Sequence, residues 1–65
     1  GERTNYMTFM EAMECLDKGY KVARYSWCDG AYLWYQTGKI LNEGDEPYIV
    51  AIDDIQATDW VNVFE

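Results

Sequence analysis

The aromatic content of this short chain constrains its fold more than any other sequence feature. Its 65 residues include three tryptophans, six tyrosines and two phenylalanines. Each aromatic side chain has on the order of 150–250 Å² of surface to bury, whereas a chain of this size buries only roughly 60% of the surface that its unfolded form exposes. We therefore expect some aromatic side chains to line an interface or a ligand site, where tyrosine and tryptophan are enriched. The alternative is a set of half-exposed rings on an open sheet face.

The length allows one domain, covering residues 1–65. Domains this small usually gain stability from disulfides, a metal or a partner subunit. The chain has no histidine, and its two cysteines, Cys15 and Cys28, cannot supply the four ligands of a structural zinc site. We expect both thiols to be reduced, with one disulfide as the alternative. Association with further copies of the chain, as a dimer or tetramer, is the remaining source of stability.

The charge of the chain limits the partners that it can bind. A net charge of −7 argues against nucleic acid, because binding to phosphates needs clustered lysine and arginine. The sequence has no signal-peptide pattern and no apolar run long enough to cross a membrane, which predicts an intracellular protein that does not bind membranes. The negative charge favours solubility, and it also suits a basic partner protein.

The first helix has the clearest sequence signals. Thr8 followed by Glu11 fits a capping box, in which each side chain accepts from a backbone N–H at the helix start. Gly19 suits the left-handed position that follows a helix. We predict a helix over Phe9–Lys18. Its buried face has the helical spacing i, i+3, i+4, i+7 and consists of Phe9, Ala12, Met13 and Leu16.

Strand patterns follow the helix. Residues 20–27 alternate with a period of two, the turn pair Asp29-Gly30 comes next, and residues 31–37 form a second alternating run. These signals predict a hairpin around residues 27–30. Both faces of the second run carry aromatic side chains, so we expect the helix to cover one face of the sheet and a partner or ligand to cover the other.

The second half of the chain predicts further short elements. Residues 39–41 read as a short strand, and residues 42–47 as a polar, acidic loop. The nearly continuous apolar run 48–52 predicts a central strand, followed by a helical turn that Asp53 and Asp54 cap, with Ile55 facing inward. Residues 60–64 close the chain as a last strand. The predicted fold is α+β, with one N-terminal α-helix packed on a small antiparallel β-sheet of four to five strands.

The residue types present argue against an enzyme. Without histidine, a Ser–His or Cys–His nucleophile pair is impossible. The sequence contains no phosphate-binding loop, dinucleotide fingerprint or zinc spacing, so we expect neither a cofactor nor a metal. Twelve acidic residues could supply a catalytic carboxylate pair, but a chain this small offers no deep cleft to perturb their pKa values. The sequence predicts a binding protein.

The candidate binding residues are aromatic faces and the polar groups near them. Aromatic side chains hold nucleobases by stacking, worth roughly 1–3 kcal/mol for each base. Arginine pairs with phosphate, and aspartate accepts from ribose hydroxyls or an amino group. The predicted ligand-binding residues are Phe9, Arg24, Trp27, Asp29, Tyr32, Asp59 and Trp60, with Trp34 as a further aromatic face.

Each of these residues also has a structural interpretation. Phe9 lies on the apolar helix face and Trp60 begins a strand, so both are candidates for the core. Arg24 is a candidate for an ion pair with a carboxylate. Trp27 is the strongest functional candidate, because a large aromatic side chain beside a tight turn is seldom placed there for packing alone.

Three segments of the chain resemble a known family. They are the run Met7–Ala12, with the pattern Met-x-Phe-x-x-Ala, the run Gly19–Trp27, with Gly-x-x-Val-x-Arg-x-x-Trp, and the run Ile52–Trp60, with Asp-Ile-x-Ala-x-Asp-Trp. In this order and spacing they are similar to a small phage and prophage domain family that includes the Thoeris anti-defence proteins. Together they span most of the chain, with a variable middle.

The resemblance implies a function. Members of that family sequester the cyclic ADP-ribose-type signal of a host immune sensor without cleaving it. They form oligomers with ligand pockets at or near subunit interfaces, and they stack aromatic side chains on the adenine. It therefore implies a phage-encoded immune-evasion protein in the cytoplasm of the infected bacterial host, with Phe9, Trp27 and Trp60 at the aromatic positions. Some relatives inhibit CRISPR nucleases, so the alternative is an acidic protein inhibitor of a host defence protein.

The chain departs from the family pattern at two places. The family commonly has Trp-Asn-Gly where this chain has Trp27-Cys28-Asp29-Gly30. Longer members also insert a segment before the closing motif that contributes polar ligand contacts, whereas this chain runs almost directly from Tyr48 to Trp60. The expected ligand is therefore a cyclic ADP-ribose-type signal, another nucleotide, or a protein.

Overall fold

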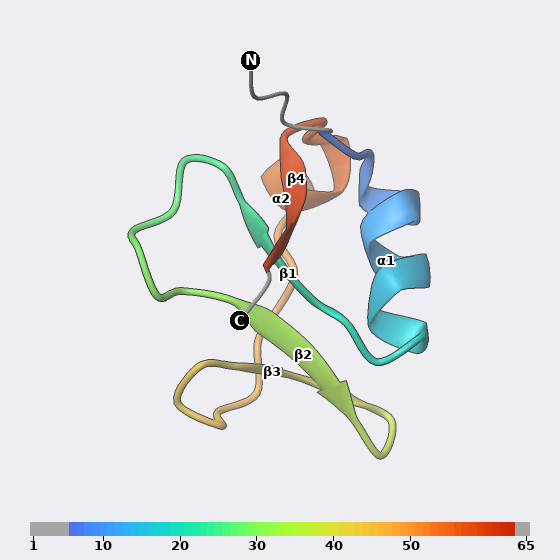
Figure 1. Cartoon of the computed structure of the whole chain (residues 1–65), viewed down its shortest axis with the longest axis vertical. Coiled ribbons are helices and arrows are strands. Elements are labelled where there is room, and N and C mark those ends of the chain that lie inside the picture. The colour runs from blue at the N-terminus through green and yellow to red at the C-terminus, as the bar shows by residue number, and fades with distance from the viewer. Residues whose placement is uncertain (1–5, 64–65) are drawn as a thin grey trace.

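A helix packed on a four-stranded antiparallel sheet forms the body of the protein (Figure 1). The computed structural model describes residues 6–63. In chain order, the elements are α1 (Phe9–Asp17), β1 (Lys21–Arg24), β2 (Leu33–Gln36), β3 (Lys39–Asn42), α2 (Ile52–Gln56) and β4 (Trp60–Val63). The strands lie in the order β3-β2-β1-β4. The predicted α+β architecture is confirmed.

Both predicted signals at the ends of α1 are present. Thr8 Oγ1 accepts from the Glu11 N–H at 3.3 Å, and the Glu11 carboxylate accepts from the Thr8 N–H at 2.9 Å, which completes the capping box. Gly19 has φ +95° at the other end, a conformation that costs glycine little because it has no Cβ. The helix ends at Asp17, one residue before the predicted end, and Lys18 is its C-cap.

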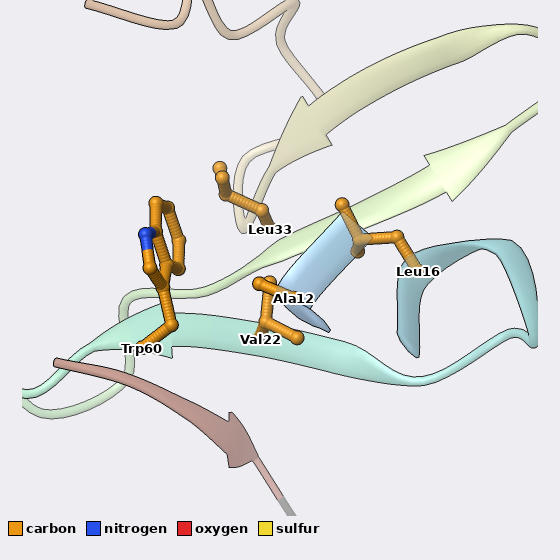
Figure 2. Close-up of a cluster of buried hydrophobic side chains, with 5 residues drawn as sticks. All are labelled: Ala12, Leu16, Val22, Leu33 and Trp60. Atoms are coloured by element: carbon orange, nitrogen blue, oxygen red, sulfur yellow. The ribbon is translucent and has the colours of Figure 1, made fainter. Parts of the chain in front are cut away.

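The core lies between α1 and the face of the sheet that this helix covers. Figure 2 shows the cluster, in which the Trp60 indole is the largest side chain and is completely buried. Backbone hydrogen bonds between Met7 and Trp60, at 2.8 and 3.2 Å, hold the segment before α1 against β4. The five buried members are Ala12, Leu16, Val22, Leu33 and Trp60.

The sheet is built from one tight hairpin and one long-range pairing. Thr37 and Gly38 have φ values of 45° and 81°, which match the two left-handed residues of a type I′ turn between β2 and β3. At the other edge β4 pairs with β1, from Lys21↔Val63 to Arg24↔Trp60. The C-terminal strand therefore lies beside the first strand of the sheet.

The hairpin predicted around residues 27–30 is present as an antiparallel pairing of β1 with β2 through Val22↔Leu33, but the predicted tight turn is wrong. β1 ends at Arg24, where the Trp27 N–H donates to the Arg24 carbonyl at 3.0 Å and turns the chain. A link of residues 25–32 then joins β1 to β2. The Tyr25 N–H donates to the Asp59 carbonyl at 2.9 Å, which continues the pairing of β1 with β4 by one residue beyond Arg24↔Trp60.

The central strand predicted at residues 48–52 is also wrong. The Tyr48 N–H donates to the Ile40 carbonyl at 2.9 Å, but the following residues leave the sheet, and Ile49 is 88% exposed. Ile52 begins α2 instead of ending a strand. Ile55 is 52% exposed and does not face inward, whereas Asp54 is 5% exposed. The buried side chain of this helix is therefore a carboxylate.

The last predicted strand corresponds to β4. Phe64, which was predicted to end it, lies outside the described residues.

Cys15 and Cys28 are free thiols. Within residues 6–63 no helix is long and apolar enough to cross a membrane, and no group of three or more metal-binding side chains is present in that range.

Candidate functional site

An open pocket of about 280 Å³ lies at the end of the sheet where β2 begins and β3 ends. Leu33 and Asn42, which pair across these two strands, both line it. The 25–32 link and the segment after β3 complete its walls. The aromatic side chains in the lining are Trp27, Tyr32 and Tyr48, and the other lining residues are Ala31 and Glu43.

The turn after β1 places Trp27 in this wall. The alternation predicted for residues 20–27 puts Trp27 on the same face of the strand as Ala23. The core residue Val22 lies on the other face. The turn instead brings the Trp27 ring to 5.6 Å from the Trp60 ring and 5.8 Å from the Tyr48 ring, measured between centroids. Trp27 is half-buried, so part of the side chain packs on the core while part remains available to the pocket.

The buried carboxylate of Asp54 holds Tyr48 in another wall of the pocket. The Tyr48 hydroxyl donates to Asp54 Oδ2 at 2.6 Å. Burial, together with the hydrogen bond and the charge of Asp54, raises the pKa of Tyr48 to about 12. The Tyr48 ring is therefore held by its polar tip while its face contributes to the pocket.

Asp54 is the centre of a wider network. It accepts from Arg24 Nη1 at 3.0 Å and from the Ala51 N–H at 3.0 Å, in addition to Tyr48. Burial opposes the ionised form, but these three donors outweigh it and lower the pKa of the Asp54 carboxyl. The Trp60 indole N–H donates to the Asp54 carbonyl at 3.0 Å, which connects the network to the core.

Arg24 is held by two carboxylates. Its Nε donates to Asp59 and its Nη1 to Asp54. Burial disfavours the charged guanidinium, but the hydrogen bonds and charges of Asp59 and Asp54 outweigh it and raise the pKa of Arg24. The structural interpretation of Arg24, an ion pair with a carboxylate, is confirmed.

The third wall carries the polar groups of the pocket. The side-chain oxygen of Asn42 accepts from the Gly44 N–H at 2.8 Å and the Glu46 N–H at 3.1 Å, which fixes the turn after β3. The Tyr32 N–H makes a long contact of 3.4 Å with Glu43 Oε1. Lys21 Nζ lies 4.6 Å from the centroid of the Tyr32 ring. The pocket thus offers aromatic faces to a planar ring, with a carboxylate beside them.

Comparison with known protein families matches residues 7–63 to the Thoeris anti-defense 2-like domain (Tad2-like). The chain belongs to this family. The match runs from the segment before α1 to the end of β4, and it includes every residue that lines the pocket. Membership of the Thoeris anti-defense 2-like family supports a phage anti-defence role. No curated protein gives a significant match to the chain.

The structure brings together some of the predicted ligand-binding residues of this Thoeris anti-defense 2-like chain. Trp27 and Tyr32 line the pocket. Trp60 and Phe9 lie 5.9 Å apart between ring centroids, with Trp60 completely buried in the described chain.

Asp59 is paired with Arg24. Asp29 is exposed and lines a second open pocket of about 270 Å³ beside the 25–32 link. The binding roles of all these residues stay predictions.

Three residues that shape the pocket were missed from sequence. The sequence places Tyr48 in a predicted central strand and Glu43 in an acidic loop without a role. It predicts Asp54 only as a helix cap. One signal for Asp54 was present: Arg24 follows the apolar residues Val22 and Ala23 on its strand and needs an opposite charge when it is buried. For Tyr48 and Glu43, the sequence contains no local pattern that places them beside Trp27.

Proposed function

We propose that this Thoeris anti-defense 2-like protein is a phage immune-evasion protein that binds and sequesters a cyclic nucleotide signal. The ligand class is cyclic ADP-ribose-type or a related cyclic nucleotide, held in the cytoplasm of the infected bacterial host and not cleaved. The observation that carries the proposal is the convergence of Trp27, Tyr32 and Tyr48 on one open pocket. Family membership adds the anti-defence role.

The size of the pocket supports binding of one ring of the ligand by each protomer. Small-molecule sites typically measure about 300–1,000 Å³, and this pocket measures about 280 Å³. That volume suits a nucleobase, but it is small for a whole cyclic dinucleotide. We therefore propose that the chain forms a dimer or tetramer in which a neighbouring copy encloses the rest of the ligand. Exposed Tyr25, Tyr35 and Ile49 supply apolar surface for such association.

The energetics also favour a shared site. Stacking contributes roughly 1–3 kcal/mol for each base, whereas a micromolar Kd corresponds to about −8 kcal/mol. Stacking in a single pocket therefore falls short of the affinity that an effective sequestering protein needs. A ligand phosphate that bound Arg24 would also have to compete with Asp54 and Asp59. Asp29, which is exposed and lines the second pocket, is available to accept a hydrogen bond from a ribose hydroxyl.

Titration calorimetry with cyclic ADP-ribose isomers and cyclic dinucleotides tests the proposal. We expect micromolar or tighter binding to the wild-type protein and at least a tenfold loss in Trp27→Ala. Tyr20→Ala is the matched control, because Tyr20 is an exposed aromatic residue next to β1 that does not line this pocket. Native mass spectrometry then reports the subunit count and the mass of the intact ligand. Binding no tighter than about 1 mM, or −4.1 kcal/mol, would contradict the proposal.

The alternative, an acidic inhibitor of a host defence protein, is favoured by a different observation. The turn after β3 exposes three carboxylates, Glu43, Asp45 and Glu46, and such a surface suits a basic protein. Binding to a purified basic defence protein should then weaken steeply as salt rises, because screening acts on exposed charges. A partner that binds with no dependence on salt would argue against this alternative.

A further inference from the structure

Glu43 holds a special position in the pocket. Of the pocket-lining residues that the structure describes, it alone has a charged side chain. The Asn42 side chain fixes the turn that presents it, through its bonds to the N–H groups of Gly44 and Glu46. The pocket therefore combines apolar and aromatic walls with a single negatively charged side chain, on a turn that Asn42 holds.

The carboxylate of Glu43 has most of its hydrogen-bonding capacity available. An ionised carboxylate has two oxygens with about four acceptor positions. Within residues 6–63, its hydrogen bonding is limited to the long 3.4 Å contact between Oε1 and the Tyr32 N–H. A ligand ring that stacks in this pocket thus meets an acceptor at its edge.

The charges around the pocket reinforce the same preference. Asp45 and Glu46 are exposed on the same turn. Arg24 donates to Asp54 and Asp59, so its charge is balanced within the protein. Lys21 contributes a positive charge on the Tyr32 side, 4.6 Å from that ring. Among the described residues named here, three carboxylates on one turn outnumber Lys21, which makes the pocket unfavourable for a phosphate.

We infer that Glu43 determines which part of the ligand enters the pocket. It accepts from the amino group on the edge of a nucleobase, and it repels phosphate, which is thereby directed out of the pocket. This inference rests on the proposed function, since it assigns the specificity of the same site. Glu43 is a specificity-determining residue, and the chemical class that it selects is an uncharged, amino-bearing ring.

The expected effects follow from charge and hydrogen bonding. A phosphate monoester carries about −1.5 to −2 charges at neutral pH. At a separation of roughly 8 Å in water, repulsion by one carboxylate weakens binding about fivefold at low salt. A hydrogen bond between an amino group and a carboxylate strengthens binding by about tenfold.

Three probes separate these effects: adenosine, purine riboside, which lacks only the amino group, and adenosine 5′-monophosphate. Binding can be followed through tryptophan fluorescence, because Trp27 lines the pocket. For the wild-type protein we expect adenosine to bind about tenfold more tightly than purine riboside and about fivefold more tightly than the monophosphate. The second ratio should approach one at about 0.5 M salt, where the Debye length is only a few ångströms.

Glu43→Gln tests the residue itself. This substitution preserves size and removes the charge, so most of the preference for adenosine over the monophosphate should be lost at low salt. Glu46→Gln is the matched control, because it removes a charge from the same turn while its hydrogen bonds to Asn42 use only the backbone. We expect Glu46→Gln to retain the preference for adenosine. Equal thermal stability of the two variants makes their affinities directly comparable.

The outcomes distinguish this inference from the proposed function. If the monophosphate binds the wild-type protein more tightly than adenosine, the inference is overturned, while the pocket stands as a nucleotide site. An unchanged ratio in Glu43→Gln overturns it in the same way. If no probe binds, and the cyclic nucleotides also fail in calorimetry, both the inference and the proposed function are wrong.

Discussion

The hydroxyl of Tyr48 donates to the buried carboxylate of Asp54 at 2.6 Å, and this bond connects the pocket to the interior. The Asp54 carboxylate also accepts from Arg24 of β1. Its backbone carbonyl accepts from the indole N–H of Trp60 in β4. The wall of the pocket is therefore positioned by the same residue that joins α2 to the sheet. Substitutions at this residue should affect both stability and ligand affinity.

Replacing Asp54 with alanine should lower the free energy of unfolding by about 2–4 kcal/mol. Removing one partner of a buried ion pair leaves the other uncompensated, which costs about 3–5 kcal/mol when both are fully buried, and the Arg24 side chain retains some exposure, at 19%. Urea unfolding measures the change. Asp53→Ala is the control, because Asp53 is exposed in the same turn of α2 and should shift stability by no more than about 0.5 kcal/mol. Equal losses in the two variants would refute the importance of the network.

Acid should remove the contribution of Asp54 to the free energy of unfolding. The folded-state pKa of this carboxyl lies below its ordinary value, because its hydrogen bonds and Arg24 outweigh the effect of burial. A lowered pKa contributes stability that is complete above the unfolded pKa of about 4 and is lost as the pH falls through the folded value. We therefore expect the stability difference between the wild-type protein and Asp54→Asn to be constant at pH 5–7 and to shrink below about pH 4. A difference that grows on acidification would contradict the assignment.

Alkali should lower the free energy of unfolding through the ionisation of Tyr48. Its pKa is raised to about 12, whereas an unfolded tyrosine ionises near about 10. The contribution is thus complete below about pH 10 and is lost as the pH rises toward about 12, because the unfolded chain releases its proton first. Absorbance of tyrosinate should show one of the six tyrosines titrating late. Tyr48→Phe should lack that late step, and its persistence would assign the shift to another tyrosine.

The N-cap of α1 offers a local test of stability. Thr8→Ala removes the acceptor for the Glu11 N–H and should cost about 1 kcal/mol. Thr8→Ser preserves the hydroxyl and should stay within about 0.5 kcal/mol of the wild-type protein. Thermal unfolding of the two variants measures the difference. Because α1 provides Ala12 and Leu16 to the core, a large loss in Thr8→Ser would mean that the threonine methyl group contributes to packing.

Local signals in the sequence predicted the parts of the fold that depend on neighbours along the chain. The capping box of Thr8 and Glu11, the apolar spacing of α1 and the turn at Gly38 all involve residues within a few positions of one another. For the same reason, the extent of α1 was correct to within one residue. Trp27 and Tyr32, both predicted as ligand-binding residues, line one pocket, and their binding role stays a prediction.

Long-range contacts determined the parts that the sequence did not predict. Residues 48–52 are apolar enough for a strand. In the structure, however, Ile52 begins α2, and this helix places the Asp54 carboxylate within hydrogen-bonding distance of Arg24. The alternation of residues 20–27 continues past Arg24, yet β1 ends there, and the Tyr25 N–H donates to the Asp59 carbonyl beside β4. Each of these partners lies about 30 positions away in the sequence, so no local pattern contains them.

The pairing of β4 with β1 has a consequence for the order of folding events. Helix α1 and the β2–β3 hairpin close through local contacts, but neither contains Trp60, the largest buried side chain. Joining Lys21 to Val63 requires a long loop to close before that contact stabilises it. Refolding should therefore proceed in a single cooperative phase whose rate is limited by the docking of β4, and tryptophan burial and secondary structure should be recovered at the same rate.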